Sequence, residues 1–184
     1  PQIDLTDGAI VAVEALVRWE GRDGQPIHPD DFIPRAENSG LIFPLTAFVI
    51  ERALGDLARW RADGHDVRAS VNLSARHLSD LALPDQIDAA LARHGVPPGA
   101  LVLEVTETGI LSDPVRADVV LRAVRGLGVE IAIDDYGTGN ASLSYLRRLK
   151  IDELKVDRSF VSNIDSDAQD LIIVRSTIEL ALAL

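Results

Sequence analysis

The sequence predicts an α/β fold, an incomplete (β/α) barrel that opens with a β-hairpin, and two observations favour it. Short β-branched runs alternate with longer amphipathic segments along the 184 residues, which is typical of repeated βα units. Glu104 and Asp134, each near the end of such a run, are thirty residues apart, about the size of one βα unit. Strands that alternate with helices predict a parallel sheet with right-handed crossovers.

Local signals place the individual elements. Thr6-Asp7-Gly8 is a turn signal between two apolar runs and predicts the opening hairpin. A helix is expected after Pro29, with Asp30 and Asp31 in its first turn. The predicted elements are strands at 3–5 and 9–19, a helix after Pro29, a helix at about 45–63, a strand at 67–73, a helix at 83–94, a strand at 101–106, a helix at 114–126, a strand at 130–135, a loop and short helix through 148, a strand at 153–156 and a helix from about 167.

The number of strands indicates an incomplete barrel. About six strands are too few for a closed barrel of eight, which takes about 250 residues. The sequence also stops at Leu184 inside an apolar helical run, without a glycine, asparagine or basic residue to end the helix. We therefore expect residues 1–184 to form one domain from which the C-terminal part of the barrel is missing.

Composition excludes several classes of protein. A net charge of −11 argues against sequence-independent binding of nucleic acid, so no DNA partner is expected. The absence of cysteine excludes a disulfide framework and a thiolate metal site. No apolar stretch suits a membrane span or a signal segment, so a cytoplasmic domain is expected, although the parent protein could be membrane-anchored. The four histidines, at positions 28, 65, 77 and 94, are expected at the surface.

Polar side chains interrupt the apolar strands near their carboxyl ends. They are Glu14, Asn72, Glu104, Glu107, Asp134, Asp135 and Lys155. The carboxyl ends of the strands in a parallel barrel converge on one pocket. Oxygen ligands without histidine or cysteine suit Mg²⁺ or Mn²⁺. The adjacent Asp134 and Asp135 could bridge two ions for in-line displacement at phosphorus, and Lys155 could orient the attacking water or stabilise charge on the phosphoryl oxygens.

Each of these residues also has a structural interpretation. Glu14 taken alone fits a salt-bridged structural residue better than a metal ligand. Asp134-Asp135 before Gly137-Thr138-Gly139 fits a strand end and a turn, Lys155 could simply pair with an acid, and Asn72 could cap a helix in competition with Ser74. Their occurrence at successive strand ends favours a shared site. The glycine motif lacks the ending of a phosphate-binding P-loop and indicates a loop beside that site.

An ordered set of motifs runs from one end of the chain to the other. They are Glu14-Ala15-Leu16 with Val17-Arg18-Trp19, Asp31-Phe32-Ile33-Pro34 with Ala36-Glu37, Ser39-Gly40-Leu41-Ile42, Val71-Asn72-Leu73-Ser74-Ala75-Arg76, Glu104-Val105-Thr106-Glu107, Asp134-Asp135-Tyr136-Gly137-Thr138-Gly139, Ser142-Leu143-Ser144-Tyr145-Leu146 and Leu154-Lys155-Val156-Asp157-Arg158-Ser159-Phe160. As a set they resemble the EAL family of bacterial cyclic di-GMP phosphodiesterases.

The resemblance implies a modified TIM barrel that hydrolyses cyclic di-GMP to linear pGpG with two divalent cations, Mg²⁺ or Mn²⁺. It implies that one metal is bound by Glu14, Asn72, Glu104 and Asp134, and the second by Asp134 and Asp135. It implies that Lys155 lies beside the metal-bound water and that Glu107 is the acid that holds the loop after Asp135. The implied contacts of the substrate are Leu16, Arg18 and Asp157, with Arg18 near a phosphate.

The resemblance also implies partners, and the sequence departs from the family in several places. A homodimer is expected through the loop after Asp135, and fusion to a diguanylate cyclase or sensory domain is common. Asn140 and Ala141 replace the usual aromatic residue and serine of that loop. A later Ala-Glu-Gly segment and a downstream glutamine are absent. We predict that the 184-residue polypeptide is therefore catalytically impaired, even where its parent is active, and full turnover would contradict this.

Two other functions remain open. The second hypothesis is a receptor that binds cyclic di-GMP without hydrolysing it. The intact metal-ligand positions favour an enzyme over this receptor. An unrelated metal-dependent barrel lyase would use Arg18 and Lys155 equally well, but the ordered motifs argue against it. Formation of linear product with Mg²⁺ or Mn²⁺, compared with EDTA, distinguishes an enzyme from a receptor.

Overall fold

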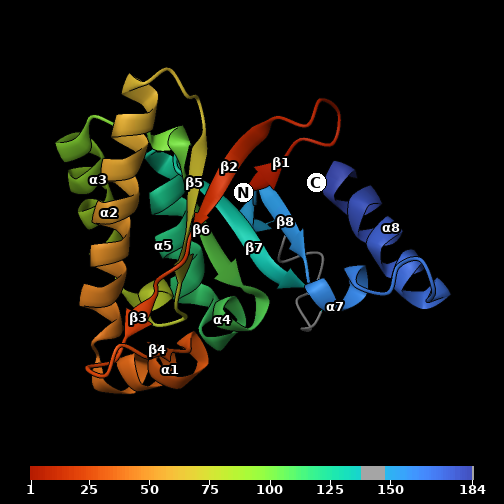
Figure 1. Ribbon diagram of the computed structural model, residues 1–184, viewed down its shortest axis with the longest axis horizontal. Helices are drawn as coiled ribbons and strands as arrows, with labels where there is room; N and C mark the ends of the chain where they lie inside the picture. The colour runs from red at the N-terminus through yellow and green to blue at the C-terminus, as the bar shows by residue number, and fades with distance from the viewer. Residues whose placement is uncertain (138–147, 184) are drawn as a thin grey trace.

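The computed structural model of the protein describes residues 1–137 and 148–183 and contains a curved sheet of six strands (Figure 1). In spatial order these are β1 (Gln2–Ile3), β2 (Ile10–Ala15), β5 (Arg68–Leu73), β6 (Leu101–Thr106), β7 (Glu130–Tyr136) and β8 (Glu153–Val156). β1 runs antiparallel to β2, and the other neighbours are parallel. The predicted incomplete TIM-type barrel with an opening hairpin is confirmed.

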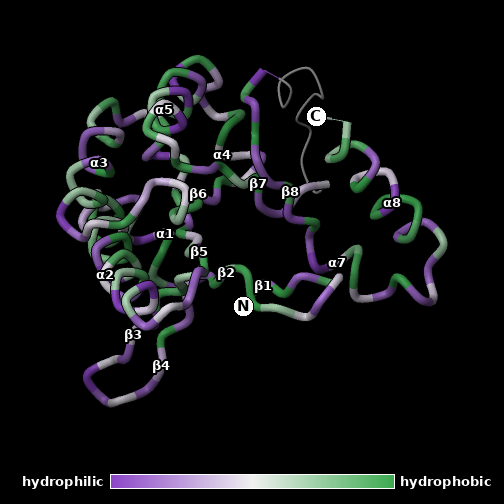
Figure 2. The backbone as a smooth tube through the Cα atoms, turned by 90° about the horizontal axis from the view of Figure 1, so that it is seen from above, coloured by the Kyte–Doolittle hydropathy of each residue, from purple (hydrophilic) through white to green (hydrophobic). Residues whose placement is uncertain are grey.

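Helices follow most of the strands. They are α1 (Pro29–Ser39), α2 (Ile42–Ala62), α3 (Leu83–His94), α4 (Glu107–Ser112), α5 (Pro114–Gly126), α7 (Arg158–Val161) and α8 (Ala168–Ala183), with 3₁₀ turns η1 (His77–Ser79) and η2 (Pro98–Ala100). Figure 2 shows the strands as an arc with α2, α3 and α5 outside it and α8 standing apart. Among the described helices, none is long and apolar enough to cross a membrane.

Most predicted boundaries agree with the observed elements. α2 begins three residues before its predicted start at Leu45, because Pro44 lies in the first turn, where its missing N–H is not needed. The expected strand at 9–19 ends at Ala15, and Trp19 belongs to a separate hairpin of β3 (Trp19–Glu20) and β4 (Pro26–Ile27). Residues 138–147, which include the predicted dimer loop, Asn140 and Ala141, lie outside the described residues.

The hydrophobic core lies between the sheet and the outer helices. Val71, Leu103 and Ile133 are at most 1% exposed and pack in one cluster with Leu54 and Leu57 of α2. Side chains alternate between the two faces of a strand, so the residues between these apolar positions point to the inner side of the arc. The core thus fixes the strands from outside and leaves the inner face for polar side chains.

Truncation of a core side chain tests this packing. Leu57 is fully buried, so Leu57→Ala should lower the free energy of unfolding by about 2–5 kcal/mol, because it removes buried methyl groups and leaves a cavity. Leu5 is 98% exposed, so Leu5→Ala is the matched control and should change stability by less than about 0.5 kcal/mol. Urea unfolding of both variants measures the difference, and equal effects would contradict the assigned core.

His77 corrects the expectation that all four histidines lie at the surface. The side chain of His77 is 2% exposed, and its ring lies 4.9 Å from that of Phe43. Burial lowers the pKa of His77 and favours the neutral imidazole. The expectation was wrong because η1 folds back against α2, a tertiary contact that the polar sequence context does not reveal.

Candidate active site

Five of the predicted site residues meet on the inner face of the sheet. They are Glu14, Asn72, Glu104, Asp134 and Lys155, one from each of the five parallel strands. Asn72 and Glu104 are directly paired across β5 and β6, and Asp134 is paired with Thr106. Because alternate residues share a face, Glu104 and Thr106 both point inward. The parallel sheet therefore brings together side chains that are far apart in sequence.

Lys155 lies at the centre of this group. Its Nζ atom is 2.7 Å from Oε2 of Glu104, 3.0 Å from Oδ1 of Asp134 and 3.9 Å from Oε2 of Glu14. Asn72 Nδ2 donates a hydrogen bond of 2.7 Å to Glu14 Oε1. One ammonium thus holds three carboxylates together, and the amide fixes the orientation of the third.

Burial and charge determine the protonation of the central pair. The Glu104 side chain is fully buried, and this burial raises its pKa, whereas the hydrogen bond from Lys155 acts in the opposite direction. Burial disfavours the charged form of Lys155, but its hydrogen bonds to Glu104 and Asp134 outweigh that effect and raise its pKa. Lys155 is therefore a cation at neutral pH, with its charge directed into the acidic group.

Asp135 and Asp157 lie beside the acidic group at the ends of β7 and β8. Asp135 has a φ angle of 53°, in the left-handed region that aspartate tolerates better than most residues. Burial, and after it the charges of Asp134 and Asp157, raise the pKa of Asp135. Asp157 caps α7 and accepts a hydrogen bond of 2.9 Å from the Ser159 amide. The two aspartates form the edge of the site nearest α7.

Glu107 occupies a different position, at the start of α4. It is 3% exposed. Burial of Tyr136 raises the pKa of that residue, and the charge of Glu107 raises it further. Glu107 thus lies close to Tyr136, the residue that follows Asp135. The remainder of that loop falls in residues 138–147, outside the described part of the chain.

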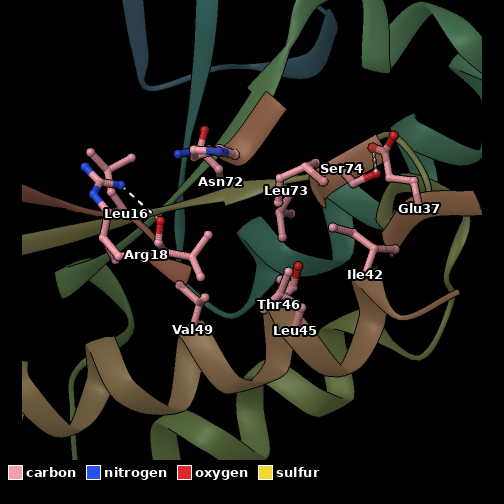
Figure 3. A pocket seen from close by; sticks show the side chains of 14 residues that line it. Leu16, Arg18, Glu37, Ile42, Leu45, Thr46, Val49, Asn72, Leu73 and Ser74 are labelled. Carbon is pink, nitrogen blue, oxygen red and sulfur yellow. Dashed lines mark hydrogen bonds between the residues drawn. The ribbon is translucent and has the colours of Figure 1, made fainter. Parts of the chain in front are cut away.

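A cavity of about 300 Å³ opens next to the acidic group (Figure 3). Leu16, Arg18 and Asn72 lie on one side of the cavity, and Glu37 and Ser74 lie on the other. Ser74 Oγ donates a hydrogen bond of 2.5 Å to Glu37, and Arg18 Nη1 donates one of 3.0 Å to the Val17 carbonyl oxygen. Asn72, which also bonds to Glu14, joins the cavity to the acidic group. Of the two capping candidates, Ser74 is the one whose side chain accepts a hydrogen bond from the following backbone, from the Arg76 amide to Ser74 Oγ.

The donor atoms of the acidic group are suited to a hard divalent cation. Glu104 Oε1 is buried and has no hydrogen-bond partner within the described residues, and every candidate ligand atom is oxygen. In the described part of the chain, no three histidine or acidic side chains are grouped closely enough to hold a metal ion. At the acidic group, the Lys155 ammonium lies between Glu104 and Asp134. The residue types fit the cation, and their present geometry is that of a lysine-centred ion-pair cluster.

Sequence reasoning assigned no role to several residues near the site. Glu37 and Thr46 line the cavity, and Ser70 lies buried beneath the acids. Glu37 stands in one of the ordered motifs, but its isolated position in a helix carries no chemical signal. Ser70 precedes Asn72 by two residues on the same strand, so strand alternation alone places both on the inner face.

Comparisons with known proteins agree with this fold. The chain is 39% identical over 185 residues to the bifunctional diguanylate cyclase/cyclic di-GMP phosphodiesterase MucR of Pseudomonas aeruginosa, covering all of the chain and 27% of that protein. It is 40% identical over 182 residues to the cyclic di-GMP phosphodiesterase NbdA of the same species, covering 98% of the chain and 23% of NbdA. The chain thus spans about a quarter of the length of these curated relatives.

A solved structure and a family description complete the comparison. The PaMucR phosphodiesterase in its c-di-GMP complex superposes with a TM-score of 0.92 at 38% identity, covering 98% of this chain and 74% of that one. The sequence model of the EAL domain family matches residues 1–184. On this match, and on the curved sheet with its inward-facing motif residues, the chain belongs to the EAL domain family.

Proposed function

We propose that this chain carries the active site of a metal-dependent phosphodiesterase that hydrolyses cyclic di-GMP to linear pGpG, a function in bacterial second-messenger signalling. The observation that carries the proposal is the convergence of Glu14, Asn72, Glu104 and Asp134 around Lys155 at one end of the sheet. Similarity to MucR and NbdA, which are named as cyclic di-GMP phosphodiesterases, supports the choice of substrate.

The acidic group would hold two cations, Mg²⁺ or Mn²⁺. Glu14, Asn72, Glu104 and Asp134 are the proposed ligands of one cation, and Asp134 and Asp135 of the second. When bound, the cations supply Lewis-acid activation of the phosphodiester and of the attacking water. Glu104 Oε1, which has no hydrogen-bond partner in the part of the chain that the structure describes, is an available oxygen ligand in this proposal.

The chain's own residues then position and stabilise the reacting groups. The Lys155 ammonium would stabilise negative charge on the phosphoryl oxygens and orient the attacking water, since its positive charge already points into the site. Glu107 would hold the segment that begins at Asp135 and continues through Tyr136. Asp157, which caps α7 beside Asp135, would contact the substrate.

The adjacent cavity would bind one part of the dinucleotide. Its volume of about 300 Å³ lies at the small end of ligand pockets, so we assign it to a single nucleoside portion and not to the whole substrate. Leu16, which is 51% exposed, offers an apolar surface to a base, and Arg18 offers a guanidinium to a phosphate.

Product formation tests the proposal directly. The full-length protein is incubated with cyclic di-GMP in Mg²⁺ or Mn²⁺ and, in parallel, in EDTA, and linear pGpG is quantified by chromatography. We expect pGpG in both metals and none in EDTA. Hydrolysis that persists at the same rate in EDTA, or no hydrolysis in either metal, would contradict the proposal.

Arg18 provides a second test. Arg18→Ala should raise the KM for cyclic di-GMP by about 10- to 100-fold, because a hydrogen-bonded contact with a charged phosphate contributes about 1.5–3 kcal/mol. Arg22 is an exposed arginine in the turn between β3 and β4, so Arg22→Ala serves as the control and should leave KM unchanged. An unchanged KM for the Arg18 variant would exclude it from the substrate contact.

A receptor that binds cyclic di-GMP without hydrolysis is the second candidate. The observation that favours it is that Lys155 already pairs with three carboxylates, so part of their negative charge is balanced without a cation. Cyclic di-GMP bound in a calorimeter, with no pGpG in the product assay, would establish the receptor in place of the enzyme.

We further propose that the domain acts in the cytoplasm as a homodimer and that its full-length protein carries an additional signalling domain. MucR, named as both a diguanylate cyclase and a phosphodiesterase, supports the last point. Sedimentation of the full-length protein with and without cyclic di-GMP measures the oligomeric state.

A further inference from the structure

Two buried polar atoms remain without a hydrogen-bond partner on the inner face of the sheet. They are Ser70 Oγ and Glu104 Oε1, and this holds within the described residues. Ser70 is 2% exposed and Glu104 is 1% exposed, so solvent does not replace the missing partners. Buried polar groups in folded proteins are almost always hydrogen-bonded, and exceptions often mark a functional role. The pair therefore requires an explanation that neither packing nor the ion pair with Lys155 supplies.

The sheet register places Ser70 between two of the proposed metal ligands. Ser70 lies directly opposite Glu14 on β2. On β6 its partner is Val102, two residues before Glu104, so Ser70 and Glu104 are diagonal neighbours on the same face. Glutamate is long enough to span such a diagonal. The Ser70 hydroxyl is therefore the inner-face group beneath both carboxylates.

Within the described residues, Ser70 Oγ and Glu104 Oε1 are the unpartnered buried atoms of this face, and their diagonal positions link the hydroxyl to Glu104. The two groups stop short of full hydrogen-bond geometry. A hydroxyl hydrogen rotates freely about its C–O bond, so a small adjustment of the Glu104 side chain is enough to complete the bond.

We propose that Ser70 is a positioning residue: its hydroxyl donates a hydrogen bond to the Glu104 carboxylate and holds that carboxylate toward the bound divalent cation. The inference rests on the proposed metal site. It assigns a role in metal affinity to a residue that contacts neither substrate nor cation. Ala132, directly opposite Glu104 on β7, offers no side-chain donor, the Asn72 amide donates to Glu14, and Lys155 donates to the other carboxylate oxygen of Glu104. Among these described neighbours, the role at Oε1 therefore falls to Ser70.

A calorimetric titration of the full-length protein with Mn²⁺ tests the assignment. We compare wild type with Ser70→Ala, which removes only the hydroxyl, and with Ser70→Thr, which retains it in a residue suited to a strand. Ser176→Ala, at an exposed position of α8, is the matched control. Loss of a partner that orients a metal ligand weakens metal binding by about 10- to 100-fold. We expect that increase in Kd for Ser70→Ala alone, with an unchanged melting temperature in the absence of metal.

The outcomes separate this inference from the proposed function. Wild-type affinity for Mn²⁺ in Ser70→Ala overturns the positioning role and leaves the metal site intact. Equal weakening in Ser70→Ala and Ser70→Thr also overturns it, since space and not the hydroxyl would then matter. If wild type itself binds no Mn²⁺, the proposed metal site fails and the role of Ser70 fails with it.

Discussion

Glu104→Gln is expected to reduce the kcat of cyclic di-GMP hydrolysis by at least about 10³-fold. Glu104 is the most buried acid of the site, and its Oε1 atom has no hydrogen-bond partner among the described residues. The substitution keeps the shape of the side chain and removes its charge, so the proposed cation loses a strong ligand. A loss of about 4 kcal/mol of transition-state stabilisation corresponds to this factor. Steady-state assays of pGpG formation at saturating Mn²⁺ measure it.

A stability measurement shows whether this loss comes from the metal. At a Mn²⁺ concentration about 100 times its Kd, binding should stabilise wild type by about 2.7 kcal/mol, and Glu104→Gln should lose most of that gain. Glu179 is an exposed glutamate on α8, so Glu179→Gln is the control and should behave as wild type. A Glu104→Gln variant that retains full activity would remove Glu104 from the proposed site.

Lys155→Met is expected to lower kcat by about 10²- to 10³-fold, the effect of removing one stabilising donor at a developing charge. Methionine preserves the length of the side chain and removes the ammonium that contacts Glu104 and Asp134. Those carboxylates then repel each other in the metal-free protein. We therefore also expect Mn²⁺ to raise the melting temperature of Lys155→Met more than that of wild type.

The chain offers a matched control for this substitution. Lys150 is its only other lysine and is exposed, so Lys150→Met changes the same residue type away from the site. Lys150→Met should retain the wild-type kcat and the wild-type response to Mn²⁺. A Lys155→Met variant with normal turnover would limit Lys155 to a structural ion pair, one of the alternatives that the sequence left open.

The elements that sequence reasoning located best are those with strong local signals. α3 and α5 have the predicted bounds, because proline near the start and an apolar stripe define each helix without reference to the rest of the fold. The hairpin of β3 and β4 was missed, since each strand has two residues and is too short for any periodicity. α4 was missed because its cap, Thr106, is also the last residue of β6, so no turn signal separates the strand from the helix.

The convergence of these side chains was predictable from the sequence, and their internal arrangement was not. Glu14, Asn72, Glu104 and Asp134 were expected near one another because the carboxyl ends of parallel strands converge. The sequence suggested that Lys155 could pair with an acid but did not reveal that it contacts three. Such a contact depends on the curvature of the whole sheet. The role inferred for Ser70 likewise depends on register between strands, which a single sequence does not encode locally.

Anomalous diffraction from crystals of the full-length protein soaked in Mn²⁺ tests the central claim most directly. We predict an anomalous peak within about 2.2 Å of oxygen atoms from Glu14, Asn72, Glu104 and Asp134, the range of oxygen-bound divalent cations of this size. A protein that binds Mn²⁺ only elsewhere, with these four side chains still held around Lys155, would contradict the proposed site.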